Sequence, residues 1–167
     1  MLLEGSCHCG AVRFGVESAM PHPYLLCYCS ICRKTDGGGG YAINLGADSS
    51  TLEVEGGENI GVYNALMRGG DDPGNAEASP GRRSFCSLCA TALWVYDPRW
   101  PELVHPFASA VDTPLPEPPE TVRMMLADRA SWAEMPDDEA ARGERHFQGF
   151  PDESLEEWHR RHGLYDA

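Results

Sequence analysis

The sequence predicts a small, mostly β protein with a zinc-stabilised sheet or sandwich-like fold and a short helix near the C-terminus. Its 167 residues favour one domain, and 42% hydrophobic with 23% charged residues is typical of a folded globular chain. The 18 glycines and 13 prolines interrupt the chain too often for long helices and leave short β-type runs between them. Seven clustered cysteines indicate zinc binding.

The first strand candidate has the alternation of a strand with one buried face. Val12, Phe14 and Val16 alternate with Arg13 and Gly15. Short runs rich in β-branched and aromatic residues predict further strands at 24–29, 41–45, 51–54, 60–63, 92–96 and 121–126. Such short strands joined by turns predict a small sandwich or a barrel-like sheet.

Two segments between the strands contain little to bury. Residues 69–81 are rich in turn formers, so we expect an exposed loop there. Residues 113–120 hold prolines that fix φ and remove hydrogen-bond donors, so we expect an extended connector.

A short helix is expected close to the C-terminus. Ser154 and Glu157 have capping-box spacing, and Gly163 suits a helix C-terminus. A helix of about two turns is unstable alone, so it must dock on the rest of the protein. We therefore expect a zinc-binding domain at residues 1–135 and an acidic C-terminal extension at 136–167.

Charge and hydropathy limit the partners. Thirteen basic residues against 26 acidic ones give a net charge of −13, so the basic surface of a nucleic-acid-binding protein is missing. No run approaches the about 18 apolar residues of a transmembrane helix, and no signal peptide is visible. We expect no nucleic-acid or membrane partner and a cytoplasmic location, where reduced thiols bind metals or react rather than form disulfides.

The cysteines divide into four plus three, which predicts two zinc ions per chain. Four thiolates close a structural zinc site, whereas three leave one position for water or substrate, as in a catalytic site. Residues i and i+2 of a strand share a side, so each C-x-C is expected to present both sulfurs from a strand. The two sets are Cys7, Cys9, Cys86 and Cys89 for the structural site, and Cys27, Cys29 and Cys32 for the second.

Two alternatives to this division stay open on spacing alone. A fourth protein ligand would close the second site and make both sites structural. In the other alternative, residues 29 and 32 join residues 86 and 89 in a ribbon-like site and leave Cys7, Cys9 and Cys27 over.

Other residues near the cysteines have simpler interpretations. Arg33 and Lys34 are expected to be surface charges, and residues 37–40 a flexible glycine turn that allows a ligand close to the second zinc. The histidines lack the spacing of a further metal site. Three aromatic residues after the last cysteines are expected to pack the core beside the zinc or, alternatively, to line a small pocket: Trp94, Tyr96 and Trp100.

Three motifs in this order resemble the glutathione-dependent formaldehyde-activating enzyme family, which shares its domain with centromere protein V. The motifs are G-S-C-H-C-G-A-V-R-F at 5–14, C-Y-C-S-I-C-R-K-T-D-G at 27–37 and R-S-F-C-S-L-C-A-T-A-L at 83–93. The resemblance implies a mostly β fold with two zinc sites on the four-plus-three ligand sets.

The resemblance also implies an activity. Members join formaldehyde to glutathione as S-hydroxymethylglutathione, which is a carbon–sulfur lyase reaction run in reverse. We therefore expect a carbon–sulfur lyase acting on a small aldehyde–thiol adduct, with Cys27, Cys29 and Cys32 as the catalytic zinc site; the alternative is a zinc-stabilised binding domain without catalysis. Ala90 departs from the glycine common in the family, so the local turn is expected to avoid a positive φ.

Overall fold

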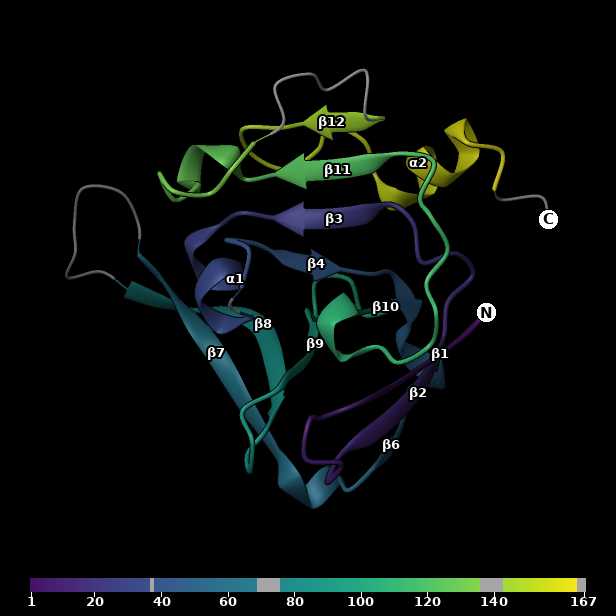
Figure 1. The fold of residues 1–167 in the computed structure, drawn as a ribbon, viewed down its shortest axis with the longest axis vertical. Helices are drawn as coiled ribbons and strands as arrows, with labels where there is room; N and C mark the ends of the chain where they lie inside the picture. Colours follow the sequence, from purple (N-terminus) through teal and green to yellow (C-terminus); the bar gives the residue numbers. More distant parts are fainter. Residues whose placement is uncertain (37, 69–75, 136–142, 165–167) are drawn as a thin grey trace.

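The computed structural model describes residues 1–36, 38–68, 76–135 and 143–164. Its strands form three sheets (Figure 1). In hydrogen-bonded order, the three-stranded sheet contains β1 (Leu2–Ser6), β2 (Arg13–Glu17) and β6 (Glu53–Glu55). The five-stranded sheet contains β5 (Ala47–Asp48), β10 (Leu103–Pro106), β9 (Ala92–Tyr96), β8 (Ala76–Cys86) and β7 (Ile60–Arg68). The four-stranded sheet contains β12 (Glu144–His146), β11 (Thr121–Met124), β3 (Tyr24–Cys27) and β4 (Ala42–Asn44).

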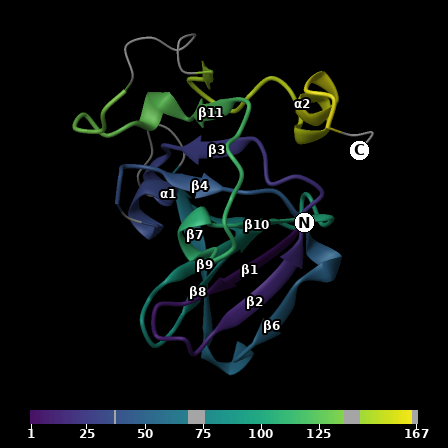
Figure 2. The ribbon, with the colours of Figure 1, turned by 45° about the vertical axis from the view of Figure 1, so that its right-hand side comes forward.

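Two short helices accompany these sheets, and both views place them at opposite sides of the four-stranded sheet (Figures 1 and 2). They are α1 (Ser30–Thr35) and α2 (Leu155–Arg161). Single 3-10 turns lie at Ser49–Thr51, Gly57–Asn59, Ala108–Ala110 and Leu126–Asp128. The mostly β class and the short C-terminal helix are confirmed, whereas α1 was not expected.

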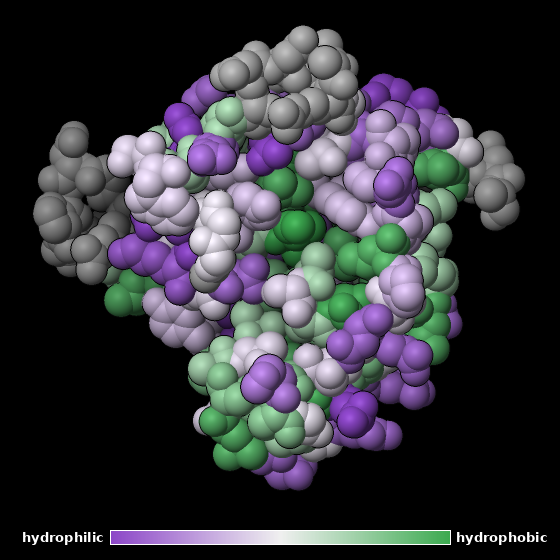
Figure 3. Space-filling view, in the orientation of Figure 1, coloured by the Kyte–Doolittle hydropathy of each residue, from purple (hydrophilic) through white to green (hydrophobic). Residues whose placement is uncertain are grey.

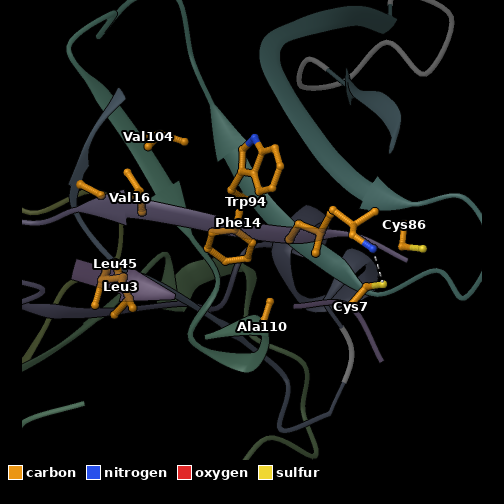
Figure 4. Packing of buried hydrophobic residues seen from close by; sticks show 12 residues of the cluster. Leu3, Cys7, Phe14, Val16, Leu45, Cys86, Trp94, Val104 and Ala110 are labelled. Atoms are coloured by element: carbon orange, nitrogen blue, oxygen red, sulfur yellow. Dashed lines mark hydrogen bonds between the residues drawn. The ribbon is translucent and has the colours of Figure 1, made fainter. Parts of the chain in front are cut away.

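The main core lies between the three-stranded and five-stranded sheets. The alternation around residue 14 is confirmed, because Phe14 and Val16 are buried whereas Arg13 is exposed. Phe14 meets Trp94 of β9 edge to face, with ring centroids 5.3 Å apart. Figure 4 shows this core continuing to Cys7 and Cys86, so apolar packing reaches one of the cysteine clusters.

The aromatic residues after the last cysteines do not all join this core. Trp94 is buried and Tyr96 packs partly against the core, as expected. Trp100 is 46% exposed, with the guanidinium of Arg99 4.7 Å from its ring centroid. The core expectation was therefore wrong for Trp100, which follows the end of β9 and lies on the surface.

The expected loop at 69–81 is partly wrong. Residues 69–75 lie outside the described part, but residues 76–81 belong to β8 and pair with β7. Pro80 of β8 has no N–H to donate to β7. Opposite it, the register of the pairing shifts between Asn64 and Leu66 of β7. The side-chain amide of Asn64 donates to the carbonyls of Ser79 and Gly81, at 3.1 and 3.3 Å, and thereby supports the irregularity.

The C-terminal residues join the four-stranded sheet. β12 pairs in parallel with β11, which pairs in parallel with β3. Both hydrogen bonds of the predicted capping box are present at Ser154 and Glu157. Trp158 is 1% exposed and donates to Glu120 at 2.8 Å, so α2 docks on the body. The division of the chain at residue 135 stays a prediction.

Candidate metal centres and the adjoining cavity

The first cysteine cluster joins the end of β1 to the β8–β9 connection. The four sulfurs of Cys7, Cys9, Cys86 and Cys89 lie within 4.8 Å of one another. Sγ of Cys9 is 3.5 Å from Sγ of Cys7 and 3.8 Å from Sγ of Cys86. A tetrahedron with zinc–sulfur bonds of about 2.3 Å separates its sulfurs by about 3.8 Å, so these thiols fit such an ion.

A turn positions the first two thiols of this cluster, whereas Cys86 is the last residue of β8. Cys7 follows β1, and Gly10 closes the turn with φ +74° and an N–H bond to the carbonyl of Cys7 at 2.9 Å. The expected strand for the C-x-C at 7 and 9 was therefore wrong. The backbone N–H of Val12 also donates to Sγ of Cys7 at 3.2 Å. The turn thus directs both sulfurs to one point and supplies a donor to a thiolate.

The C-x-x-C at 86 and 89 forms the other half of the cluster. Hydrogen bonds from the hydroxyl and N–H of Thr91 lower the pKa of Cys89 to about 5. The turn contains Ala90 with φ +61°, and its N–H donates to the carbonyl of Cys86 at 2.8 Å. The expectation that the turn avoids a positive φ was wrong, because this hydrogen bond keeps the tight turn despite the Cβ.

The second cluster lies where β3 gives way to α1. The sulfurs of Cys27, Cys29 and Cys32 lie within 4.8 Å of one another, and Cys27 and Cys32 are buried. Cys29 is the N-cap of α1, and its Sγ accepts the N–H of Cys32 at 3.3 Å. This cap turns the chain from strand to helix, so the expectation of a strand through residue 29 was wrong.

The electrostatics of this cluster favour a thiolate at Cys29. Hydrogen bonds from the thiols of Cys27 and Cys32, and then from the N–H groups of Cys32 and Ile31, lower the pKa of Cys29 to about 2. The hydrogen bond from Cys27 to Cys29 raises the pKa of the Cys27 thiol, because Cys27 is its donor, and burial raises this pKa further. The cluster therefore holds negative charge on at least one sulfur and could hold a metal ion.

The described cysteines thus gather as four plus three. Cys29 and Cys32 are in a different cluster from Cys86 and Cys89, so the ribbon-like alternative does not form. No fourth Cys, His, Asp or Glu joins the triplet among the residues that the structure describes.

A cavity of about 280 Å³ is connected to the triplet through two of its lining residues, although none of the three cysteines lines it. Arg83 lines it and donates from Nη2 to Sγ of Cys32 at 3.6 Å. Phe107 also lines it and packs with Cys27 and Cys32 in one buried cluster. The full lining is Thr35, Tyr63, Arg83, Ser84, Phe85, Ala90, Ala92 and Phe107.

The sequence predicted other residues around the second metal site and a small pocket. Gly38 and Gly40 have positive φ, as a glycine turn requires, but no described residue of the glycine run lines the cavity. Trp94 and Tyr96 do not line it either. Arg83 was missed, although it lies three residues before Cys86 in the third motif; the strand period of two places residues 83 and 85 on one side of β8.

A buried polar network supports the triplet from the four-stranded sheet. Tyr28, between Cys27 and Cys29, is 1% exposed, and Arg123 of β11 donates from Nη1 to its hydroxyl. Arg123 also pairs with Glu144 of β12 through two hydrogen bonds, at 2.8 and 3.0 Å. The network connects the C-terminal strand to the loop that carries the thiols.

Fold and thiols together define a small, mostly β protein with two cysteine clusters that could hold metal ions. The family profile named glutathione-dependent formaldehyde-activating enzyme matches residues 2–125. The chain belongs to this family. No helix among the described residues is long and apolar enough to cross a membrane.

Two known proteins show the extent of the similarity. A Halomonas elongata protein, provisionally named glutathione-dependent formaldehyde-activating enzyme, is 59% identical over 167 residues and matches 100% of both chains. A crystal structure of a Rhodobacter sphaeroides protein has a TM-score of 0.50 and 26% identity, and the match covers 68% of this chain and 91% of that chain. The resemblance of the cysteine motifs to the family is therefore confirmed.

Proposed function

We propose that this protein is a carbon–sulfur lyase that joins a small aldehyde, formaldehyde in the first instance, to the thiol of glutathione. The substrate sulfur forms a bond to the carbonyl carbon, and the carbonyl π electrons move to oxygen. The thiol loses one proton and the oxygen gains one, so S-hydroxymethylglutathione is the only product. The reverse reaction breaks the same carbon–sulfur bond. The observation that carries the proposal is a three-thiol cluster beside a cavity, in a chain of this family.

The triplet fits the pattern of an open zinc site. Cys27, Cys29 and Cys32 offer three ligands, and catalytic zinc sites keep three protein ligands and one exchangeable position. Zinc, when bound, lowers the pKa of a substrate thiol and polarises an aldehyde oxygen. We propose that the chain binds two zinc ions, with the second in the four-thiol cluster.

The chain's own residues supply the surroundings of the reaction. Phe85, Ala92 and Phe107 give the cavity apolar walls. Arg83 places a positive charge 3.6 Å from Sγ of Cys32. That charge offsets the excess negative charge that three thiolates leave on a divalent ion.

The four-thiol cluster has a structural part in this proposal. It joins Cys7 and Cys9 to residues 86 and 89, far along the chain, and a closed tetrahedron leaves no position for substrate. All seven cysteines are free, which suits a protein that works in the reducing cytoplasm.

Two-dimensional exchange NMR of formaldehyde and glutathione tests the proposed reaction. The zinc-loaded protein should accelerate exchange between free and thiol-bound formaldehyde above the spontaneous rate, and Cys29→Ser should return it to that rate. Wild-type protein stripped of zinc and then reloaded is the control for metal dependence. An absence of acceleration by the zinc-loaded wild type would leave a binding domain without catalysis, and full activity in Cys29→Ser would remove the triplet from the reaction.

A further inference from the structure

Arg83 lies between the three-thiol cluster and the cavity. Its backbone pairs with Tyr63 of β7 and Val95 of β9, so a strand on each side holds it in place. Nη2 donates to Sγ of Cys32, but Nη1 is buried and has no acceptor in the described part of the chain. The guanidinium thus keeps one unused donor beside the site.

An unused buried donor on a cation is unfavourable, and native proteins rarely keep one that nothing occupies. Arg33, the neighbour of Cys32 in α1, has the same feature, since its buried Nε also lacks an acceptor. Of these two arginines only Arg83 lines the cavity, so its unused Nη1 is the donor that concerns the site. This pattern points to an anion that binds there.

Asp36, an acid that interacts electrostatically with Arg83, does not supply that anion. Asp36 lies at the end of α1. Burial raises the pKa of its carboxyl, and the positive charge of Arg83 lowers that pKa by a smaller amount. Its Oδ1 accepts from the hydroxyl of Ser109 at 2.9 Å, and no ion pair with Arg83 is formed among the described contacts. None of the described residues therefore supplies the acceptor for Nη1, and a bound molecule in the cavity that Arg83 lines can supply it.

We propose that Arg83 binds a carboxylate of the thiol substrate and thereby selects carboxylate-bearing thiols over neutral ones. The inference rests on the proposed function, because the thiol of the same molecule is placed at the triplet. A guanidinium forms strong, directional hydrogen bonds with a carboxylate. The net charge of −13 repels an anionic substrate over most of the surface, so a local cation is needed to recognise it.

Calorimetric titration of the zinc-loaded protein tests this assignment with a matched pair of probes, 3-mercaptopropionate and its methyl ester. The acid should bind wild type more tightly than the ester. Loss of the charge beside Cys32 affects the thiol of both probes, but Arg83→Gln should weaken the acid by about 10- to 100-fold more than the ester, because only the acid loses a hydrogen bond to a charged group. Arg82→Gln removes an adjacent, exposed arginine and should change neither affinity.

Three results would overturn the assignment: no binding of the acid to wild type, an unchanged acid affinity in Arg83→Gln, or equal losses for acid and ester. Zinc content and circular dichroism are measured for every variant. If Arg83→Gln loses zinc or unfolds, Arg83→Lys takes its place, since it keeps the charge but not the planar fork. It should weaken the acid more than the ester, and equal effects on the two probes would overturn the assignment.

This titration and the exchange experiment fail independently. Selectivity that depends on Arg83 without accelerated formaldehyde exchange would support the carboxylate site and refute the proposed reaction. Accelerated exchange with a preference for acid over ester that does not depend on Arg83 would refute the carboxylate site and leave the reaction standing.

Discussion

Ala90 shows how one side chain strains the turn at the four-thiol cluster. It has φ +61°, where an L-residue with a Cβ is about 1–2 kcal/mol less stable per residue than in the right-handed region. Glycine has no Cβ, but it loses about 0.5–1 kcal/mol in conformational entropy relative to alanine.

We therefore expect Ala90→Gly to raise the free energy of unfolding by about 0.5–1 kcal/mol, since relief of the strain exceeds the added entropy cost. Urea denaturation of the zinc-loaded protein measures it. Ala127→Gly, at an exposed alanine without a positive φ, should lower stability instead. Equal effects of the two substitutions would contradict strain at Ala90.

Glu144 is the buried acid on which the polar network behind the triplet depends. Its side chain is 8% exposed, and that of Arg123 is 14% exposed. Glu144→Gln leaves the arginine charge buried without its counterion, so we expect a loss of about 3 kcal/mol in the free energy of unfolding. Glu156→Gln breaks an exposed i,i+4 pair with Arg160 and should cost much less.

The same carboxyl gives a dependence on pH. The hydrogen bonds with Arg123 hold the pKa of Glu144 below its ordinary value of 4.5. A carboxyl whose pKa is lower in the folded than in the unfolded state stabilises the protein when it is ionised. This stabilisation is fully present above the unfolded-state pKa and is lost as the pH falls through the folded-state pKa. The difference in stability between wild type and Glu144→Gln should therefore shrink on acidification from pH 6 toward this range, and a difference that grows would contradict the pairing.

At the scale of secondary structure, the two helices differ in how far the sequence could predict them. A capping box is recognised by a Ser or Thr three residues before a Glu or Gln in the sequence. Residues 154 and 157 have this spacing, so they predicted α2 directly. The cap of α1 is a cysteine sulfur, which accepts the backbone N–H of Cys32 at 3.3 Å. Spacing alone does not show that arrangement, so the chain was expected to continue as a strand.

The capping box gives a prediction for α2. Ser154→Ala removes the acceptor for the N–H of Glu157, at 3.2 Å, and should lower local stability by about 1 kcal/mol. Hydrogen exchange in the first turn of α2 should be faster by the corresponding factor. Ser154→Asn keeps a good N-cap and should exchange like wild type. Equal exchange in Ser154→Ala and wild type would show that docking of Trp158 alone holds the helix.

At the scale of the whole molecule, local patterns predicted most strands but not their order in sheets. The alternation around Phe14 reflects a buried face and is visible in sequence. The parallel pairing of β12 with β11 and of β11 with β3 joins segments far apart in the chain, and the pairing depends on tertiary contacts. Arg83 and Phe107 meet at the cavity for the same reason, so the cavity could not be predicted from either residue's neighbours.

Figure 3 shows hydrophobic residues in the middle of one face of the molecule and also at its right-hand and lower edges, with hydrophilic residues between and above them. Inside the molecule, small buried hydrophobic clusters and the two cysteine clusters connect the sheets. Structural zinc sites contribute about 10–16 kcal/mol of apparent binding energy in peptides, and this energy is coupled to folding. The two clusters should therefore respond differently to the loss of one thiol, because one joins distant segments and the other is local.

Zinc content measured together with circular dichroism in two Cys→Ser variants tests this division most directly. Wild type should hold two zinc ions per chain. Cys86→Ser should lose both its fold and its metal, because the distant segments are no longer joined. Cys29→Ser should stay folded and keep one zinc ion, because only the local site is lost. A folded Cys86→Ser that retains two zinc ions, or a Cys29→Ser that unfolds as Cys86→Ser does, would contradict a structural four-thiol site beside an independent three-thiol site.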